Sequence, residues 1–251
     1  MSEVSRFTRH IPNTATSLNL FSGFISILLT AEGNLTMGSW FILIALVFDF
    51  SDGFLARMLK AYSELGKQLD SLADVVSFGV APALLFFRAF QIAFETRYGV
   101  FSFGDLQFFE KVMLISPVLL VITSAWRLGK FNIDPAQEDT FIGLPTPATG
   151  VFIASYTLIA FGEMNEGLIQ YLVHPVFLLV LTILFSLLMI SKIPMFSLKF
   201  HSFGWKENRL RYVFIGISLI LVILIKLLAI PVVILTYIVV SAGIQIVKKN
   251  T

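Results

Sequence analysis

Four aspartates lie close together in an otherwise apolar part of this chain. They form two pairs, Asp49 with Asp52 and Asp70 with Asp74. Residues three or four apart share one face of a helix, so each pair presents two carboxylates together. Carboxylates at membrane depth are costly, and they repel one another unless a cation intervenes. Hard divalent cations such as Mg²⁺ or Mn²⁺ prefer oxygen ligands, so the spacing predicts a site for two such ions that could promote displacement at phosphorus.

Small residues and one arginine accompany the aspartates. Gly53 and Ala56 follow the first pair on the same helix, and Gly66 precedes the second pair. They leave an uncrowded surface against which a flat base or a diphosphate could rest. Arg57 adds a planar cation that suits phosphate oxygens in a geometry that lysine would not match. The run therefore predicts a phosphate-binding surface beside the metal site.

The composition indicates an integral membrane protein. Of 251 residues, 57% are hydrophobic and 14% are charged, whereas soluble domains average about 45–50% and about 25%. A spanning helix needs about 20 mostly apolar residues. Eight spans are predicted, at 13–31, 37–57, 69–92, 111–128, 147–164, 170–191, 210–225 and 227–247. Only Lys226 and Leu227 mark a turn between the last two, so six or seven spans form the alternative.

The distribution of basic residues predicts the orientation. Most of the 18 Lys and Arg residues lie on the side shared by the two termini and the loops 57–68, 127–146 and 192–211. The positive-inside rule places that side in the cytoplasm. We expect an all-α polytopic transmembrane helix bundle of about eight spans with both termini cytoplasmic. Residues 1–12 form a cytoplasmic juxtamembrane segment, either a surface helix or a frayed arm, and 13–251 form a single transmembrane domain.

The aspartate run resembles the signature of the CDP-alcohol phosphotransferase family. Residues 49–74 match every fixed position of Asp-x2-Asp-Gly-x2-Ala-Arg-x8-Gly-x3-Asp-x3-Asp. Family members transfer a phosphoryl-linked group from a CDP-linked donor to an alcohol and release CMP. The resemblance implies that all four aspartates bind metal and that Asp74 is also the catalytic general base. It further implies a CDP-binding set of Asn13, Thr16, Asp52, Gly53, Ala56, Arg57 and Gly66.

Polar residues outside this run indicate the acceptor. Asn13, Thr16 and Asn19 form a polar stripe at the start of the first span, which could also serve helix capping. Ser77 shares the face of Asp74, although a hydroxyl there could instead bond back to its own helix at a kink. No Cys is present and the motif holds no His, so direct displacement is expected rather than a covalent enzyme intermediate.

The end of the fourth predicted span carries two basic residues, Arg127 and Lys130, which could also be simple positive-inside anchors. With the polar stripe and the Ser77 region, they resemble the CDP-diacylglycerol–serine O-phosphatidyltransferase branch of the family over residues 9–150. Members often have Arg-Phe-Asn where this chain has Lys130-Phe-Asn132. The resemblance implies a serine-binding set of Ser77, Arg127, Lys130 and Asn132, with Arg127 as the first choice to bind the serine carboxylate.

The resemblance implies an enzyme that uses CDP-diacylglycerol, L-serine and two Mg²⁺ or Mn²⁺ ions. It also implies contact with membrane lipids, a homodimer and no nucleic-acid partner. We expect it in the bacterial inner (cytoplasmic) membrane, with the active site facing the cytoplasm. Two alternatives stay open. One is the same chemistry with glycerol 3-phosphate, inositol phosphate or choline. The other is a divalent-cation transporter, although such proteins usually place carboxylates near the midplane and in repeated halves.

Overall fold

The computed structural model describes residues 6–99, 102–133, 141–162, 171–196 and 204–249, and helices make up most of them. The first half contains α1 (Arg6–Ala31), α2 (Leu35–Met58), α3 (Glu64–Asp74), the π-helix η1 (Val75–Val80), α4 (Ala81–Tyr98), α5 (Phe108–Ile115) and α6 (Val118–Ile133). The second half contains α7 (Thr146–Phe161), α9 (Pro175–Ile190), α10 (Trp205–Ile225), the 3₁₀ turn η3 (Lys226–Leu228) and α11 (Ala229–Lys249). Two short strands, β1 (Phe141–Ile142) and β2 (Pro194–Met195), pair in antiparallel fashion.

Five helical segments are long and apolar enough to cross a membrane. They are His10–Ala31, Leu35–Met58, Glu64–Tyr98, Phe108–Ile133 and Asn208–Gln245. Two shorter apolar helices, α7 and α9, accompany them. The helical class is therefore confirmed, and the five candidate spans are consistent with an integral membrane protein, whereas the count of eight spans and the orientation of the termini stay predictions. The helix α1 is continuous through Pro12, so the described residues show no break at the predicted boundary of the juxtamembrane segment.

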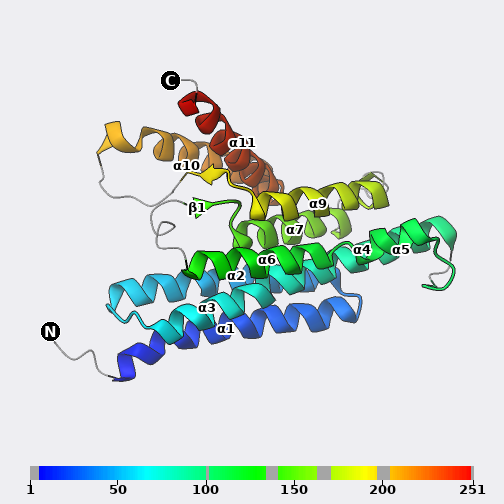
Figure 1. Cartoon of the computed structure of the whole chain (residues 1–251), viewed down its shortest axis with the longest axis horizontal. Coiled ribbons are helices and arrows are strands. Elements are labelled where there is room, and N and C mark those ends of the chain that lie inside the picture. The colour runs from blue at the N-terminus through cyan, green and yellow to red at the C-terminus, as the bar shows by residue number, and fades with distance from the viewer. Residues whose placement is uncertain (1–5, 100–101, 134–140, 163–170, 197–203, 250–251) are drawn as a thin grey trace.

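Local chemistry explains where several helices begin and end. The Asn34 side chain accepts a hydrogen bond from the Met37 amide at 3.0 Å and caps α2. The Ser63 hydroxyl accepts one from the Gly66 amide at 3.0 Å and caps α3. At Lys226 the backbone has a φ of 48°, and there the chain turns back so that α10 and α11 form a hairpin beside the bundle (Figure 1).

The first helix buries its polar face and exposes its apolar one. Phe21 and Phe24 are more than half exposed, at 58% and 51%. The buried stripe runs along the opposite face and consists of Thr16, Asn19, Ser22, Ser26 and Thr30. This arrangement suits a helix whose outer surface meets lipid, because lipid does not penalise an apolar exterior as water would. The stripe directs the polar groups of α1 toward α2 and α3.

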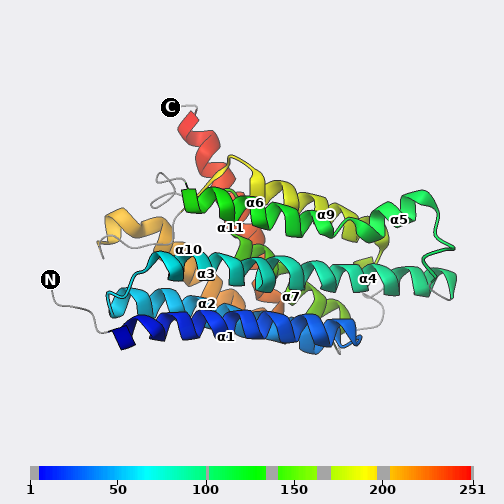
Figure 2. The same cartoon turned by 60° about the horizontal axis from the view of Figure 1, so that its bottom comes forward.

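Close contacts hold η1 at the centre of the bundle. A Cβ on Gly23 of α1 would lie 2.7 Å from the Ser77 Cα, and one on Gly150 of α7 would lie 2.9 Å from the Phe78 Cα. Small residues at such positions let helix backbones approach closely. Figure 2 shows α3, η1 and α4 as one continuous rod between α1 and α6. Because η1 follows Asp74 directly, these contacts set the position of that carboxylate.

Replacement of Gly23 by Ala is expected to destabilise this packing. The added Cβ would meet the Ser77 hydroxyl at 2.2 Å and the Ser77 Cα at 2.7 Å, and backbone cannot move aside cheaply. The thermal midpoint of the detergent-solubilised protein should fall by several degrees. Gly243→Ala is the matched control, because a Cβ there meets nothing within 4 Å. Equal midpoints for both variants would contradict the close contact.

Candidate functional site

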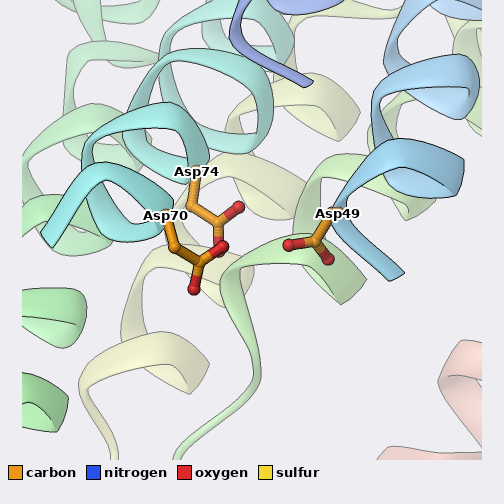
Figure 3. Close-up of side chains that lie close together, drawn as sticks. All are labelled: Asp49, Asp70 and Asp74. Carbon is orange, nitrogen blue, oxygen red and sulfur yellow. The ribbon is translucent and has the colours of Figure 1, made fainter. Parts of the chain in front are cut away.

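Three carboxylates from two helices meet at one end of the bundle. Asp49 comes from α2, and Asp70 and Asp74 lie one turn apart on α3. Each offers a carboxylate oxygen within 4.8 Å of the others, and their side chains point toward one another (Figure 3). The end of α2 and the start of α3 are joined by a short turn, so the two helices run in opposite directions (Figures 1 and 2). Tertiary packing thus brings Asp49 of α2 together with Asp70 and Asp74 of α3, three of the four carboxylates that the spacing predicts for one site.

The fourth aspartate has a different environment. Asp52 lies outside the group of three, and its Oδ2 accepts a hydrogen bond of 2.7 Å from the Thr16 hydroxyl of α1. Its charge still acts on Asp49 and Asp70. The structure therefore separates the predicted set into a tight group of three and one neighbouring carboxylate that is hydrogen-bonded to α1.

Asp74 is buried and is held by α1. Its Oδ1 accepts a hydrogen bond of 3.3 Å from the Asn19 side-chain amide. The Ser77 hydroxyl donates to the Asn19 backbone carbonyl at 3.0 Å, so it joins two helices rather than bonding back to its own. Asn19 is thus a site residue that the predicted sets omit, although its spacing from Asn13 and Thr16 was a usable signal.

The group of three aspartates fits a divalent cation. The Asp70 Oδ1 and the Asn19 Oδ1 are buried and have no hydrogen-bond partner. A buried acceptor without a donor is rare, because its desolvation is not compensated. Carboxylate and amide oxygens are the ligands that Mg²⁺ and Mn²⁺ prefer. The donor set and the orphaned oxygens therefore both match the predicted metal site.

The residues predicted to line a CDP site lie at the same end of the bundle. The Asn13 Oδ1 would be 3.0 Å from a Cβ on Gly66, so α1 and α3 touch there. A Cβ on Gly53 would meet nothing within 4 Å, and this face of α2 is therefore open. Ala56 is half-buried, and Arg57 is exposed on the last turn of the same helix. This surface has room for a flat or extended ligand beside the carboxylates.

A buried cation lies on the other flank of the carboxylates. Arg127 of α6 is only 6% exposed and lies within electrostatic range of Asp74. One guanidinium nitrogen donates to the Thr146 hydroxyl at 3.3 Å, whereas Nε is buried without a partner. The Thr149 hydroxyl, one turn further along α7, is also buried without a partner. Arg127 therefore has unused donor capacity beside the Thr146 hydroxyl, which is an arrangement suited to a carboxylate.

The two remaining predicted acceptor residues, Lys130 and Asn132, have other partners in the structure. Lys130 is exposed, and its ammonium lies 5.8 Å from the centroid of the Trp126 ring. The Asn132 amide donates to the Ser71 hydroxyl of α3 at 2.9 Å. Asn132 thereby ties the end of α6 to the helix that carries Asp70 and Asp74.

Comparison with known proteins gives a consistent assignment. The family described as CDP-alcohol phosphatidyltransferase matches residues 9–244. An archaetidylserine synthase from Methanothermobacter thermautotrophicus is 34% identical over 163 residues, which cover 64% of this chain and 63% of that protein. A CDP-diacylglycerol–serine O-phosphatidyltransferase from Helicobacter pylori strain J99 is 34% identical over 59% of this chain and 57% of that protein. The enzyme of the same name from Bacillus subtilis is 32% identical over 77% of this chain and 93% of that protein. The chain thus matches less than two thirds of the length of the first two relatives.

Proposed function

The chain belongs to the CDP-alcohol phosphatidyltransferase family, and from this premise we propose that it transfers the phosphatidyl group of CDP-diacylglycerol to the hydroxyl of L-serine. The products are phosphatidylserine and CMP. The observation that carries the proposal is the buried Arg127, which donates to Thr146 and lies within electrostatic range of Asp74, a member of the group of three aspartates. An acceptor that carries a carboxylate near its hydroxyl matches this pairing of a cation and a base. Relatives named for the same reaction support it.

The donor is proposed to bind along the open face of α2. Gly53 and Ala56 leave space for the nucleotide, and Arg57 supplies a cation for phosphate oxygens. Thr16 holds Asp52 at this surface through its hydrogen bond. Asp49, Asp70 and Asp74 would hold one or two Mg²⁺ or Mn²⁺ ions, with Asp52 nearby. Such ions, when bound, stabilise negative charge on the diphosphate and on the leaving CMP.

The acceptor is proposed to bind between Asp74 and Arg127. The oxygen of the serine hydroxyl forms a bond to the phosphorus that carries diacylglycerol, and Asp74 accepts the proton of that hydroxyl in the same step. The bond from that phosphorus to the CMP oxygen breaks in the same displacement, and CMP leaves with the electron pair. Arg127 pairs with the serine carboxylate and the Thr146 hydroxyl assists, so the reacting oxygen is held near the base.

We further propose that the site faces the cytoplasm of the bacterial inner membrane and that the enzyme acts as a homodimer. Basic residues support this orientation, because they concentrate in the loops at the end of the bundle that carries the aspartates. At that face, both water-soluble serine and the headgroup of CDP-diacylglycerol can reach the carboxylates.

An acceptor panel tests the proposed reaction. Purified protein in detergent with CDP-diacylglycerol and Mn²⁺ or Mg²⁺ is expected to release CMP when serine is added. Release with glycerol 3-phosphate, inositol phosphate or choline, and not with serine, would contradict serine as the acceptor but agree with the proposed type of reaction. No CMP release with any of the four alcohols would contradict the proposal that the protein catalyses this transfer. Metal flux into liposomes without nucleotide would then support the transporter alternative.

Removal of divalent ions is expected to abolish turnover. The three converging carboxylates lose their counter-charge, and the donor diphosphate loses its electrostatic partner. Treatment with EDTA followed by gel filtration should reduce CMP release to background, and added Mg²⁺ or Mn²⁺ should restore it. Full activity in the presence of the chelator would contradict a divalent-metal site.

Replacement of Gly53 by Ala is expected to impair donor binding without loss of stability. A Cβ there meets no protein atom within 4 Å, so it would protrude into the space proposed for the nucleotide. The KM for CDP-diacylglycerol should rise by about tenfold, as expected for the loss of roughly 1.4 kcal/mol of binding energy. Gly216→Ala in α10 is the control, because its Cβ is equally free of contacts. Equal KM values for both variants would place the nucleotide elsewhere.

A further inference from the structure

The C-terminal helix α11 forms two hydrogen bonds with the backbone of Phe196, the residue that follows β2. The Tyr237 hydroxyl donates to the Phe196 backbone carbonyl at 3.1 Å. The Phe196 amide donates to the Ser241 hydroxyl at 3.4 Å. Tyr237 and Ser241 lie one turn apart on α11, so both backbone groups of Phe196 are held by one helix face. Tyr237 and Ser241 together fix the backbone of Phe196 against α11.

The segment that contains Phe196 leads to Thr146, the hydrogen-bond partner of Arg127. The strand β2 ends at Met195 and pairs with β1, with Phe141 opposite Met195. After β1, the Gly143 amide donates to the Ile193 carbonyl at 2.9 Å, and Gly143 adopts a φ of 75°. Three residues after Gly143, α7 begins at Thr146, which accepts the hydrogen bond from Arg127. Hydrogen bonds and short stretches of backbone thus connect α11 to the partner of the buried guanidinium.

The Tyr237 side chain is held in a fixed position. The proton of its phenolic hydroxyl is engaged by the Phe196 carbonyl. Contacts with the Phe196 ring, at a centroid distance of 4.9 Å, and with the Phe214 ring, at 6.0 Å, hold the tyrosine ring in place.

We propose that Tyr237 is a positioning residue for recognition of the acceptor carboxylate. Its hydroxyl fixes the β1–β2 ribbon that leads to Thr146, and Thr146 in turn accepts the hydrogen bond from Arg127. The C-terminal hairpin, which contributes no residue to the aspartate group, thereby sets the affinity for the amino-acid acceptor. This inference rests on the proposed function, because it takes serine as the molecule that Arg127 binds.

The test compares two tyrosine hydroxyls that each donate to a backbone carbonyl. Tyr237→Phe removes the hydroxyl and keeps the ring contacts. Its KM for serine should rise about fivefold, the effect of losing one hydrogen bond to a neutral carbonyl that supports the ribbon. Its kcat and its KM for CDP-diacylglycerol should stay within about twofold, which also verifies that the protein is folded. Tyr156→Phe is the control, because the Tyr156 hydroxyl donates to the Leu172 carbonyl in another part of the bundle. It should leave the KM for serine unchanged.

Two results would overturn the inference. One is an unchanged KM for serine in Tyr237→Phe while the wild type is active. The other is an equal rise in both tyrosine variants, which would indicate a general loss of stability. Failure of the proposed function is separate and appears first, since the unmodified protein would then release no CMP with serine.

Discussion

Replacement of Asp74 by Asn is expected to lower kcat by about 10³-fold, within the range attributed to general acid–base catalysis. The substitution keeps the shape of the side chain and removes its ability to accept a proton from the acceptor hydroxyl. Asp49 and Asp70 still offer carboxylates for a metal ion, and Asp52 stays bound to Thr16. Binding of CDP-diacylglycerol should therefore be retained. CMP release measures the rate, and equilibrium binding of the labelled donor measures the affinity.

Asp105→Asn is the matched control for this substitution, because Asp105 is an exposed aspartate outside the site. It should keep the wild-type rate. A loss of donor affinity as large as the loss of rate in Asp74→Asn would contradict a separate role for Asp74 as the base. In that case the residue would act through metal binding alone.

Replacement of Arg127 by Lys is expected to raise the KM for serine by about 10²-fold. Lysine keeps the positive charge but lacks the planar fork that can bind a carboxylate through two nitrogens. Its three N–H donors also radiate from one nitrogen, whereas the guanidinium can bond Thr146 through one nitrogen and direct the others at the acceptor. The loss of a buried charge-assisted hydrogen bond, about 1.5–3 kcal/mol, accounts for an effect near this size. Steady-state kinetics with varied serine at saturating donor measure the effect.

The KM for CDP-diacylglycerol should change little in Arg127→Lys, because Arg57 and the α2 surface are proposed to bind the donor. Arg88→Lys provides the control, since Arg88 is a half-buried arginine of α4 that donates to the Gln91 side chain. It should keep the wild-type KM for serine. If Arg127→Lys instead raised the KM for CDP-diacylglycerol and left the KM for serine unchanged, the acceptor site would have to lie elsewhere.

Much of the fold and of the metal site could be predicted because both depend on local patterns. Hydropathy identifies apolar stretches, and five of the resulting helices are long and apolar enough to span a membrane. Helical spacing places Asp70 and Asp74 on one face, and the structure keeps them together. Hydropathy does not indicate the π-helix η1, because the hydrogen-bond register of the backbone leaves no trace in apolar periodicity. Such insertions occur frequently at functional sites.

By itself, the sequence determined that this chain is a helical membrane protein with paired carboxylates suited to a divalent metal. Only the tertiary structure decided which groups share the site. It set Asp52 apart with Thr16, brought Asn19 to Asp74, and placed Arg127 with Thr146. The physical reason is that spacing defines a face within one helix, whereas the rotation and distance between helices depend on packing. Contacts such as Gly23 against Ser77 fix that packing, and they join residues far apart in the chain.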